Sequence, residues 1–411
     1  MQRYLSMRAY REFTLLWAGS TISALGDSLT WIALVWLVYD ATGSAGKVGL
    51  LVVVYTAPVI IGGLLAGVAL DRFNRRLVLI VDNVVRGAVM AAIPILFHLD
   101  LLRLWHLYVV AGVYGSMKML SLAGVPTMIP GLVPEEHLNT ANALESISFG
   151  IAAIAGPGVG ALLIARIGGA NVLLIDAATY YALVACLLGV SSQSAPQPTR
   201  STSGLGPAMA FVLTTPAVLA ITVMFAAANV GIGMLEVVLP VYAREVLRQG
   251  VSTYGLLVSA MGAGSLLGAV LVGGLASPRS LGRAIAAAQL CYGLSFLGLL
   301  FTPHLPVTLA LLSGAGLLGA PLTVWAQTVR MRLIPGHLRG RVFGLLRTVM
   351  QAAPPLGGAL GGILVAGTGI PVTVVVIAGA IGGAGALGLV VRALAREYTI
   401  APAQVRSERR G

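Results

Sequence analysis

The sequence predicts an all-α integral membrane protein with twelve transmembrane helices in two six-helix bundles. Three observations support this prediction: a mean hydropathy of +0.92, a content of 57% hydrophobic against 10% charged residues, and long apolar runs separated by short polar loops. A soluble core does not need so much apolar surface, so lipid is the expected solvent. The two cysteines, Cys186 and Cys291, fall inside apolar runs and are expected to be packing residues without a disulfide or zinc-type spacing.

Runs of about 20 apolar residues, the length that crosses a bilayer, recur along the chain. The first is too long for the core of a signal peptide, so we predict a retained helix there. Glycine and proline within the runs are compatible with helices, because neighbouring helices satisfy the freed backbone groups in a membrane. The twelve predicted spans lie at 13–39, 46–70, 77–97, 104–130, 140–165, 170–190, 213–241, 252–275, 281–302, 306–330, 340–366 and 370–394.

A polar segment at 191–207, rich in serine, proline, glutamine and glycine, divides the chain near its middle. We therefore predict an N-terminal bundle at 1–190, a cytoplasmic linker at 191–212, a C-terminal bundle at 213–396 and a cytoplasmic tail at 397–411. The halves also share short patterns: Pro157-x-x-Gly160-Ala161-Leu162 recurs as Pro355-x-x-Gly358-Ala359-Leu360, 198 residues later. A duplicated unit in parallel orientation predicts a binding site between the halves at mid-membrane.

Arginine and lysine predict the orientation. With the N-terminus inside, nineteen of the 26 basic residues fall in cytoplasmic segments and five on the opposite face, while Arg86 and Lys118 lie within spans. Basic residues are enriched in cytoplasmic loops, so we expect both termini in the cytoplasm and the protein in the cytoplasmic (inner) membrane. The net charge of +12 is scattered over short loops and forms no stripe or patch, which argues against nucleic-acid binding.

The short connection between the second and third spans gives the strongest functional signal. It reads Gly67-Val-Ala-Leu-Asp71-Arg72-Phe-Asn-Arg75-Arg76. Asp71 stands at the C-terminal end of its helix, where the helix dipole disfavours a carboxylate. We therefore expect the adjacent arginines, or the positive N-terminus of another helix, to hold it.

Charged residues inside spans are candidates for transport chemistry, because each costs about 2.5–3.5 kcal/mol at a helix centre. Asp27, near the middle of the first span, is the first candidate for proton binding. The alternative is a buried carboxylate held by the backbone or by a basic residue of a neighbouring helix. Glu236, in the seventh span, either lines the cavity as a second proton site or faces solvent at the span boundary. Lys118, in the fourth span, either pairs with an acid such as Asp27 or attracts an anionic group of the substrate.

Asp82 and Arg86 are four residues apart on the third span and share a helix face, which predicts an internal ion pair. Asp176 stands near the start of the sixth span, where a carboxylate is electrostatically favoured, and is expected to be structural. Trp31 and Asn229 are candidates for lining a central cavity, although such residues also form aromatic belts and interhelical hydrogen bonds.

Prolines interrupt two spans. Gly156-Pro157 lies in the fifth span and Pro354-Pro355 in the eleventh. Each proline removes one backbone hydrogen bond and kinks its helix, while glycine allows close helix contact. We expect bending at these points to contribute to alternating access, with static close packing as the alternative.

The sequence lacks the motifs of nucleotide-driven transporters, metal sites and common catalytic sites. A phosphate-binding loop needs Gly-x4-Gly-Lys-Ser/Thr, and the nearest approach, Gly46-Lys47, has Ala41 and Val48 at two required positions. The five histidines lie in loops or at span ends without metal spacing, and no catalytic triad or Cys-His arrangement stands out. We therefore expect no enzyme, no cofactor and no metal, and active transport would be driven by an ion gradient, with protons as the natural choice.

The loop Gly67-x3-Asp71-Arg72-x2-Arg75-Arg76 resembles the signature of the major facilitator superfamily. The motif Gly156-Pro157-x2-Gly160 is similar to the span-five motif of proton-coupled antiporters in that superfamily, although Ala161 stands where a second glycine is usual.

The resemblance to one branch of the superfamily covers roughly residues 11–396. The pair Gly26-Asp27 and the segments 141–144 and 340–345 are similar to the branch of bacterial macrolide-efflux proteins and the enterobactin exporter. The sequence departs from the loop signature at Asn74, where glycine is frequent.

The resemblance implies the major facilitator fold and a secondary transporter that exports small amphipathic molecules, of drug or siderophore type, by proton antiport and alternating access. Asp71, Arg72, Arg75 and Arg76 would then form a cytoplasmic gate between the halves. Proton-coupled or facilitated uptake and lipid flipping remain open on the same scaffold, and a passive channel would not need the gate. We expect a monomer whose partners are a small-molecule substrate, protons and the lipid bilayer.

Overall fold

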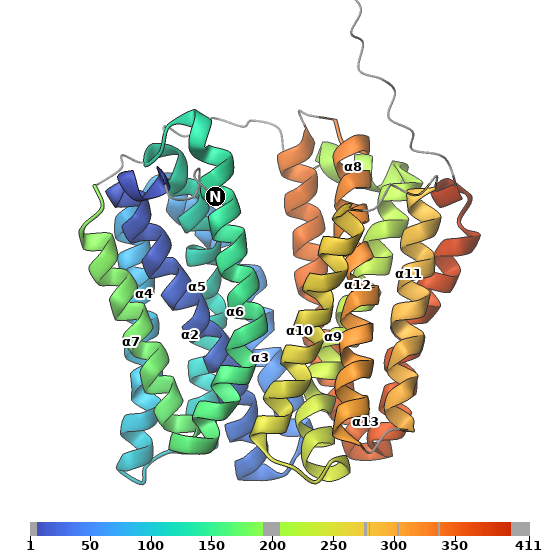
Figure 1. Ribbon diagram of the computed structural model, residues 1–411, viewed down its shortest axis with the longest axis horizontal. Helices are drawn as coiled ribbons and strands as arrows, with labels where there is room; N and C mark the ends of the chain where they lie inside the picture. Colours follow the sequence, from blue (N-terminus) through green and yellow to red (C-terminus); the bar gives the residue numbers. More distant parts are fainter. Residues whose placement is uncertain are drawn as a thin grey trace, which may run out of the picture.

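The computed structural model describes residues 6–191, 206–274, 278, 280–301, 304–335 and 338–395, and every regular element within these ranges is helical. Two helical bundles stand side by side, and the long helices of each run roughly parallel to one another (Figure 1). The predicted tail at 397–411 and residues 192–205 of the predicted linker lie outside the described ranges.

Six long helices build the N-terminal bundle. Short connections join them: Gly43 ends the first helix in the left-handed conformation, with φ 58°, and the side chains of Ser44 and Asn74 cap the next two by accepting backbone hydrogen bonds from Lys47 and Leu77. The helices are α2 (Arg11–Thr42), α3 (Ala45–Arg72), α4 (Arg75–His98), α5 (Leu104–Met128), α6 (Leu138–Ile167) and α7 (Gly169–Leu188), with short turns η1 (Met7–Ala9), η2 (Ile129–Gly131) and η3 (Glu135–His137).

The C-terminal bundle begins with a short helix, α8 (Gly206–Thr214), within the stretch predicted as linker. Ala208 and Val212 of α8 are buried against Val218, Val342 and Leu346, so this helix belongs to the packing of the second bundle. The remaining elements are α9 (Pro216–Val241), the π-helical turn η4 (Tyr242–Val246), α10 (Val251–Gly274), α11 (Leu281–Ser295), η5 (Phe296–Leu300), α12 (Leu305–Leu333), α13 (Arg339–Val390) and η7 (Arg392–Ala395).

The described chain has eleven helices that are long and apolar enough to cross a membrane, and the last contains two crossings. Its 50 residues, Arg341–Val390, would measure about 75 Å as one straight helix, more than twice the thickness of a hydrocarbon core. Gly369 breaks it with φ 84° and ψ 176°, values outside the helical region, and the chain turns back there (Figure 1). The prediction of an all-α protein with twelve spans is thereby confirmed.

The same helix pairs pack in both bundles. In the first bundle, α3 packs on α5, α4 on α7, and α2 on α6 and α7. In the second, α10 packs on α12, α11 on α13, and α9 on α13 both before and after its break at Gly369. Glycine permits the closest contacts. A Cβ atom at Gly115 would lie 1.9 Å from the carbonyl oxygen of Tyr55, and one at Gly264 would lie 1.8 Å from that of Ser313. The α3–α5 and α10–α12 pairs thus use the same device.

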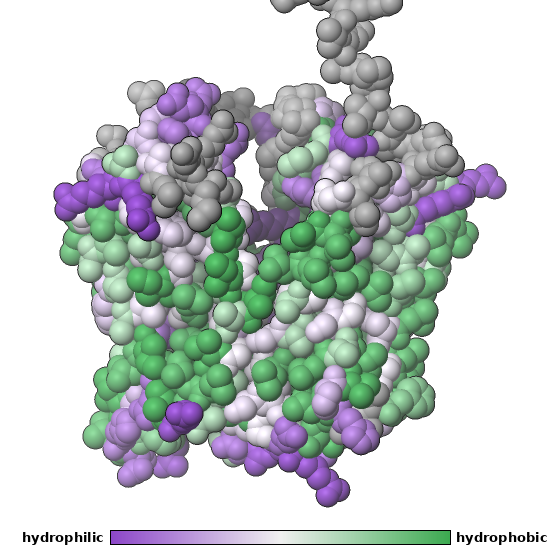
Figure 2. Space-filling model, viewed as in Figure 1, coloured by the Kyte–Doolittle hydropathy of each residue, from purple (hydrophilic) through white to green (hydrophobic). Residues whose placement is uncertain are grey.

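The two bundles meet through α3 against α13 and α6 against α10. These contacts also need glycine, because a Cβ atom at Gly49 would lie 2.5 Å from the Gly358 carbonyl oxygen and one at Gly255 would lie 2.5 Å from that of Pro157. On the face shown in Figure 2, the surface is hollowed between the bundles at the end that holds the N-terminus, and hydrophobic residues cover most of the middle of the molecule. We call this end the open end and the opposite end the closed end.

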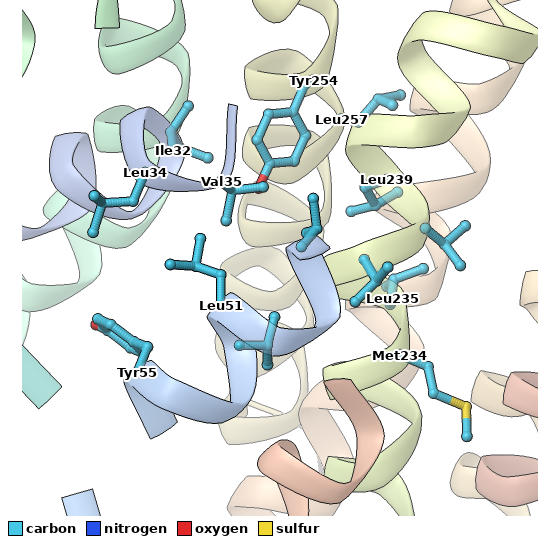
Figure 3. Close-up of a cluster of buried hydrophobic side chains, with 14 of the residues drawn as sticks. Ile32, Leu34, Val35, Leu51, Tyr55, Met234, Leu235, Leu239, Tyr254 and Leu257 are labelled. Carbon is cyan, nitrogen blue, oxygen red and sulfur yellow. The ribbon is translucent and has the colours of Figure 1, made fainter. Parts of the chain in front are cut away.

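Buried side chains continue across the junction of the bundles. Ile32, Val35 and Leu51 from the first bundle belong to the same core cluster as Leu235 and Tyr254 from the second. Figure 3 shows these side chains approaching one another between α2, α3, α9 and α10. The junction is therefore sealed by apolar packing over helices of both halves.

We predict that Gly115→Ala and Gly264→Ala each destabilise the protein, because the added methyl group must displace a backbone carbonyl of the partner helix. Overpacking of this kind costs about 1–3 kcal/mol. The thermal unfolding midpoint in detergent, followed by circular dichroism, should fall for both variants. Gly150→Ala and Gly314→Ala are the matched controls, since nothing lies within 4 Å of either added methyl group. Equal midpoints for all four variants would contradict the close-packing account.

Candidate functional site

A cavity of about 500 Å³ lies between the bundles and is lined by residues from α2, α3, α5 and α6 of the first and from α9 and α13 of the second. Its walls combine apolar side chains with a few charged and polar ones, which is the usual composition of a small-molecule site. The polar and aromatic lining comprises Asp27, Ser28, Trp31, Tyr55, Lys118, Phe149, Glu236, Arg347 and Gln351.

Arg86 organises a buried polar network behind the cavity wall. Its side chain has no exposed surface and pairs with Asp82, with Nη2 to Oδ2 at 2.7 Å and Nε to Oδ1 at 3.1 Å. Nη2 also donates to the hydroxyl of Ser121 at 2.6 Å, and the guanidinium lies 4.4 Å from the ring centre of Tyr180. A buried cation surrounded in this way is stabilised by its partners, so Arg86 holds α4 against α5 and α7.

Asp27 joins this network to the cavity. Its Oδ1 accepts a hydrogen bond from the Tyr180 hydroxyl at 2.5 Å and lies 3.4 Å from Nη1 of Arg86. The side chain keeps 25% of its surface exposed and lines the cavity. The sequence left two alternatives for Asp27: a proton-binding residue, or a buried carboxylate held by a basic residue of a neighbouring helix. Asp27 has such a basic neighbour in Arg86, and it also faces the cavity.

Asp176 is fully buried between α2 and α7 without a cationic partner in the described chain. Its carboxylate accepts hydrogen bonds from the hydroxyls of Thr30 and Thr179. Gly26 makes room for it, because a Cβ atom there would lie 2.1 Å from Oδ1. Asp176 therefore joins the first and last helices of the N-terminal bundle, as expected for a structural residue.

Lys118 is held by aromatic rings. Its Nζ donates to the Tyr55 hydroxyl at 2.9 Å and lies 5.3 Å and 6.0 Å from the ring centres of Tyr55 and Tyr114. Over the described ranges, no carboxylate lies within ion-pair distance of it. Trp31 completes this aromatic wall, with its ring centre 4.4 Å from that of Tyr55.

Glu236 reaches the same cavity from the opposite bundle. It is half-buried on α9, and its Oε2 is buried without a hydrogen-bond partner among the described residues. Oxygen atoms of a carboxylate are strong acceptors, and leaving one unsatisfied in a membrane interior is costly. Glu236 therefore differs from Asp27, whose carboxylate is already held by the protein.

Asn229 lies away from Asp27 and Lys118, in a second cavity of about 290 Å³ within the C-terminal bundle. Residues of α9, α10, α11 and α12 line this second cavity. Asn229 and Glu236 occupy the same face of α9, two turns apart, so the two cavities follow each other along one helix.

The loop at 67–76 lies at the open end, and its hydrogen bonds stay within the first bundle. Arg75 donates to the Thr127 carbonyl at 2.6 Å, and Arg76 donates to the carbonyls of Leu187 and Leu188 at 2.8 Å and 2.9 Å. Both arginines thus satisfy the last carbonyls of α5 and α7, where a cation also meets the negative end of the dipole.

Asp71 and Arg72 are exposed in the same loop, and neither makes a hydrogen bond or ion pair with the described residues. The partner that was expected for Asp71, an adjacent arginine or another helix N-terminus, is not engaged in this arrangement. Gly67 precedes them on α3 with open space around it.

The Gly156-Pro157 segment of α6 packs on both sides. A Cβ atom at Gly156 would lie 2.3 Å from the Ser28 Cβ on α2, and one at Gly160 would lie 3.2 Å from the Leu29 Cδ2. On the other side, the Pro157 carbonyl faces Gly255 of α10. At this one segment, α6 therefore both contacts the other bundle and lines the cavity.

Polar contacts between the bundles close the opposite end of the cavity. Arg244 on η4 pairs with Asp40 on α2, with Nη1 to Oδ1 at 2.8 Å, and the Tyr39 hydroxyl donates to Oε1 of Glu245 at 2.9 Å. The Arg244 guanidinium also lies 5.7 Å from the Tyr39 ring centre. We call these four residues the closed-end latch.

Sequence reasoning did not identify the latch or the partners of Asp27 and Lys118. The residues of each contact are far apart in the chain: 204 residues separate Asp40 from Arg244, and 153 separate Asp27 from Tyr180. A signal existed for the latch, since Asp40 and Arg244 follow the first and seventh spans, which correspond in a duplicated protein.

Comparisons with known proteins agree with this geometry. A family model described as "Transmembrane secretion effector" matches residues 5–405. The multidrug efflux pump Tap of Mycolicibacterium fortuitum is 28% identical over 371 residues, covering 87% of this chain and 90% of the pump. The enterobactin exporter EntS of Salmonella typhimurium is 25% identical over 380 residues, covering 89% and 88%. The crystal structure of the nucleoside transporter NupG superposes with a TM-score of 0.71 at 12% identity, covering 92% of this chain and 98% of NupG.

We predict that Arg244→Asp loosens the closed end, because it places a carboxylate opposite Asp40 and removes their ion pair. The pair is 45% and 57% exposed, so the expected effect is about 1 kcal/mol, or roughly a fivefold change in the population of the opened arrangement. Exchanging the charges, with Asp40→Arg and Arg244→Asp together, should restore the original population.

Spin labels at Ala41→Cys and Gly250→Cys, in a background with both native cysteines replaced by serine, measure this opening by the distance across the closed end. Arg248→Asp is the matched control: it makes the same charge change in the same connection, and Arg248 has no ion pair in the described chain. The latch assignment would be wrong if Arg248→Asp had the same effect or if the charge exchange failed to restore the distance distribution.

Proposed function

The chain belongs to the transmembrane secretion effector family of the major facilitator superfamily, and on that premise we propose that it exports a small amphipathic molecule in exchange for protons. The family is one of membrane transporters rather than enzymes, and the relatives Tap and EntS are named as an efflux pump and an exporter. Glu236 carries the antiport proposal, because its buried oxygen lacks a partner in the described chain and lies in the cavity between the bundles.

We place the open end in the cytoplasm. The positive-inside rule supports this orientation, because the basic loop at 67–76 and most other arginines lie in segments on that side. A cavity that faces the cytoplasm admits substrate from inside the cell or from the inner leaflet, which suits export. The closed-end latch then faces outward and must open for release.

Glu236 and Asp27 take different parts in the proposed proton coupling. A proton or a cationic group satisfies the free oxygen of Glu236, so the two compete for one carboxylate, which is the simplest basis for exchange. Asp27 already accepts from Tyr180 and lies beside Arg86, so its protonation releases part of the Arg86 network. Protonation of Asp27 in the cavity would thereby change the contacts that hold α4 and α7.

The loop at 67–76 acts as the gate at the open end. In the arrangement described here, Asp71 is exposed and Arg75 and Arg76 cap helices of their own bundle. When the bundles close at this end, Asp71 can meet the positive N-terminus of α13, which begins at Arg339 on the same side. The contacts of the closed-end latch and those of this gate would then form in alternate states of the transport cycle.

We predict that Glu236→Gln abolishes coupled proton movement in proteoliposomes, because the amide carries no exchangeable charge. Asp27→Asn should lower coupled flux by about tenfold or more, since it weakens the contact with Arg86 and the proton site together. Proton movement on addition of a transported dye, followed with a pH-sensitive fluorophore, measures both. The matched control is Glu135→Gln, which neutralises an exposed carboxylate outside the cavity. Unchanged stoichiometric flux in Glu236→Gln would remove that residue from the coupling.

We predict that Asp71→Asn slows export by about fivefold, the effect of losing roughly 1 kcal/mol of partly exposed charge interaction in the closed gate. Substrate affinity in the open arrangement should stay the same, because Asp71 does not line the cavity. Asp100→Asn, an exposed acid at the other end, is the control. A parallel loss of affinity would show that Asp71 acts on the cavity and not on the gate.

A further inference from the structure

The second cavity has the composition of a binding site without any charged lining residue. Two aromatic side chains, Phe225 and Tyr292, form part of its wall, and three polar side chains, Asn229, Ser265 and Thr323, project from three different helices. A few convergent polar groups in an otherwise apolar and aromatic cavity are the usual features of a site for a drug-sized ligand.

These three polar groups make no hydrogen bond with the described protein. Other hydroxyls of this bundle behave differently: Thr222 donates to the Val218 carbonyl at 2.6 Å and Thr328 to that of Val324 at 3.0 Å. Such bonds to the own helix are the common way to satisfy a hydroxyl in a membrane span. Asn229, Ser265 and Thr323 instead leave their hydrogen-bonding capacity to whatever occupies the cavity.

Charge is distributed unequally between the two cavities. One charge borders the wall of the second cavity: Arg330 is 4% exposed, and its guanidinium lies 4.6 Å from the ring centre of Phe225. A cationic ligand group is therefore disfavoured there. Glu236, by contrast, lies seven residues from Asn229 along α9, which corresponds to about 10.5 Å.

We propose that the substrate is a two-part molecule: a cationic group binds at Glu236, and a neutral, hydrogen-bonding ring system about 10 Å away binds to Asn229, Ser265 and Thr323 between Phe225 and Tyr292. This inference rests on the proposed export function and names its substrate class. It assigns ionic recognition to the first cavity and selectivity for shape and hydrogen bonding to the second.

Two monovalent probe cations separate the parts. Ethidium carries aromatic amino groups that can hydrogen-bond, whereas tetraphenylphosphonium has aromatic rings and the same charge without a hydrogen-bonding group. The experiment measures equilibrium binding of each to the purified full-length protein. The near-isosteric variants Asn229→Leu and Thr323→Val should each raise the Kd of ethidium by about tenfold and leave that of tetraphenylphosphonium within about twofold.

Glu236→Gln should weaken the binding of both cations, because both carry the same charge. Thr328→Val is the matched control, since it removes a hydroxyl that bonds to its own helix outside the cavity. The proposal is overturned if Asn229→Leu and Thr323→Val affect both probes equally or neither, or if the unaltered protein binds neither cation.

Proton flux in the same variants distinguishes this inference from the proposed function. Asn229→Leu with normal coupled proton movement and unchanged ethidium affinity would remove the two-part site and leave antiport intact. If every variant, including Glu236→Gln, kept normal coupled proton movement, that result would instead contradict the proposed export mechanism. Each protein is first checked by size-exclusion chromatography, so that a folding defect is separated from a binding defect.

Discussion

A charged group inside a lipid-embedded bundle needs either a partner or a cavity, and this constraint arranges the interior of the protein. Arg86 meets it with Asp82, Ser121 and Asp27, and Lys118 meets it with the hydroxyl and ring of Tyr55. Glu236 lines the cavity, and its buried Oε2 has no hydrogen-bond partner in the described chain. Because an unsatisfied charged group is costly in a membrane, the proposed coupling places the competition between ligand and proton at Glu236.

The junction of the bundles combines firm and weak contacts. Glycine brings α3 against α13 and α6 against α10 at backbone distance, and apolar side chains seal the core between them. The Asp40–Arg244 ion pair in the closed-end latch is exposed, so it contributes little to stability. A transporter must exchange one closed end for the other at modest cost. The exposed Asp40–Arg244 pair at the closed end, beside a tightly packed junction, suits that requirement.

Local patterns explain what the sequence predicted, and distance along the chain explains what it missed. Twelve apolar runs gave the spans, and Gly369 marks the turn inside the last long helix. The i,i+4 spacing placed Asp82 beside Arg86 because one helix face is a local property. Tyr180 beside Asp27 depends on how α7 packs against α2, which no local spacing encodes. Thr323 and Thr328 look alike in sequence, and only the packed bundle shows which one faces a cavity.

The position of Glu236 also sets a rule for the proposed transport cycle. Closing the open end removes water from the cavity, and an ionised carboxylate without a partner would then be buried at a cost of several kcal/mol. A proton removes that cost by neutralising the group, and a cationic substrate removes it by pairing. In the proposed cycle, the bundles would therefore reorient readily when either a proton or a cationic substrate is bound, and slowly when neither is bound. In the proposed antiport, both satisfy the same carboxylate and travel in alternate halves of the cycle, so that exchange would follow from desolvation without any direct contact between proton and substrate.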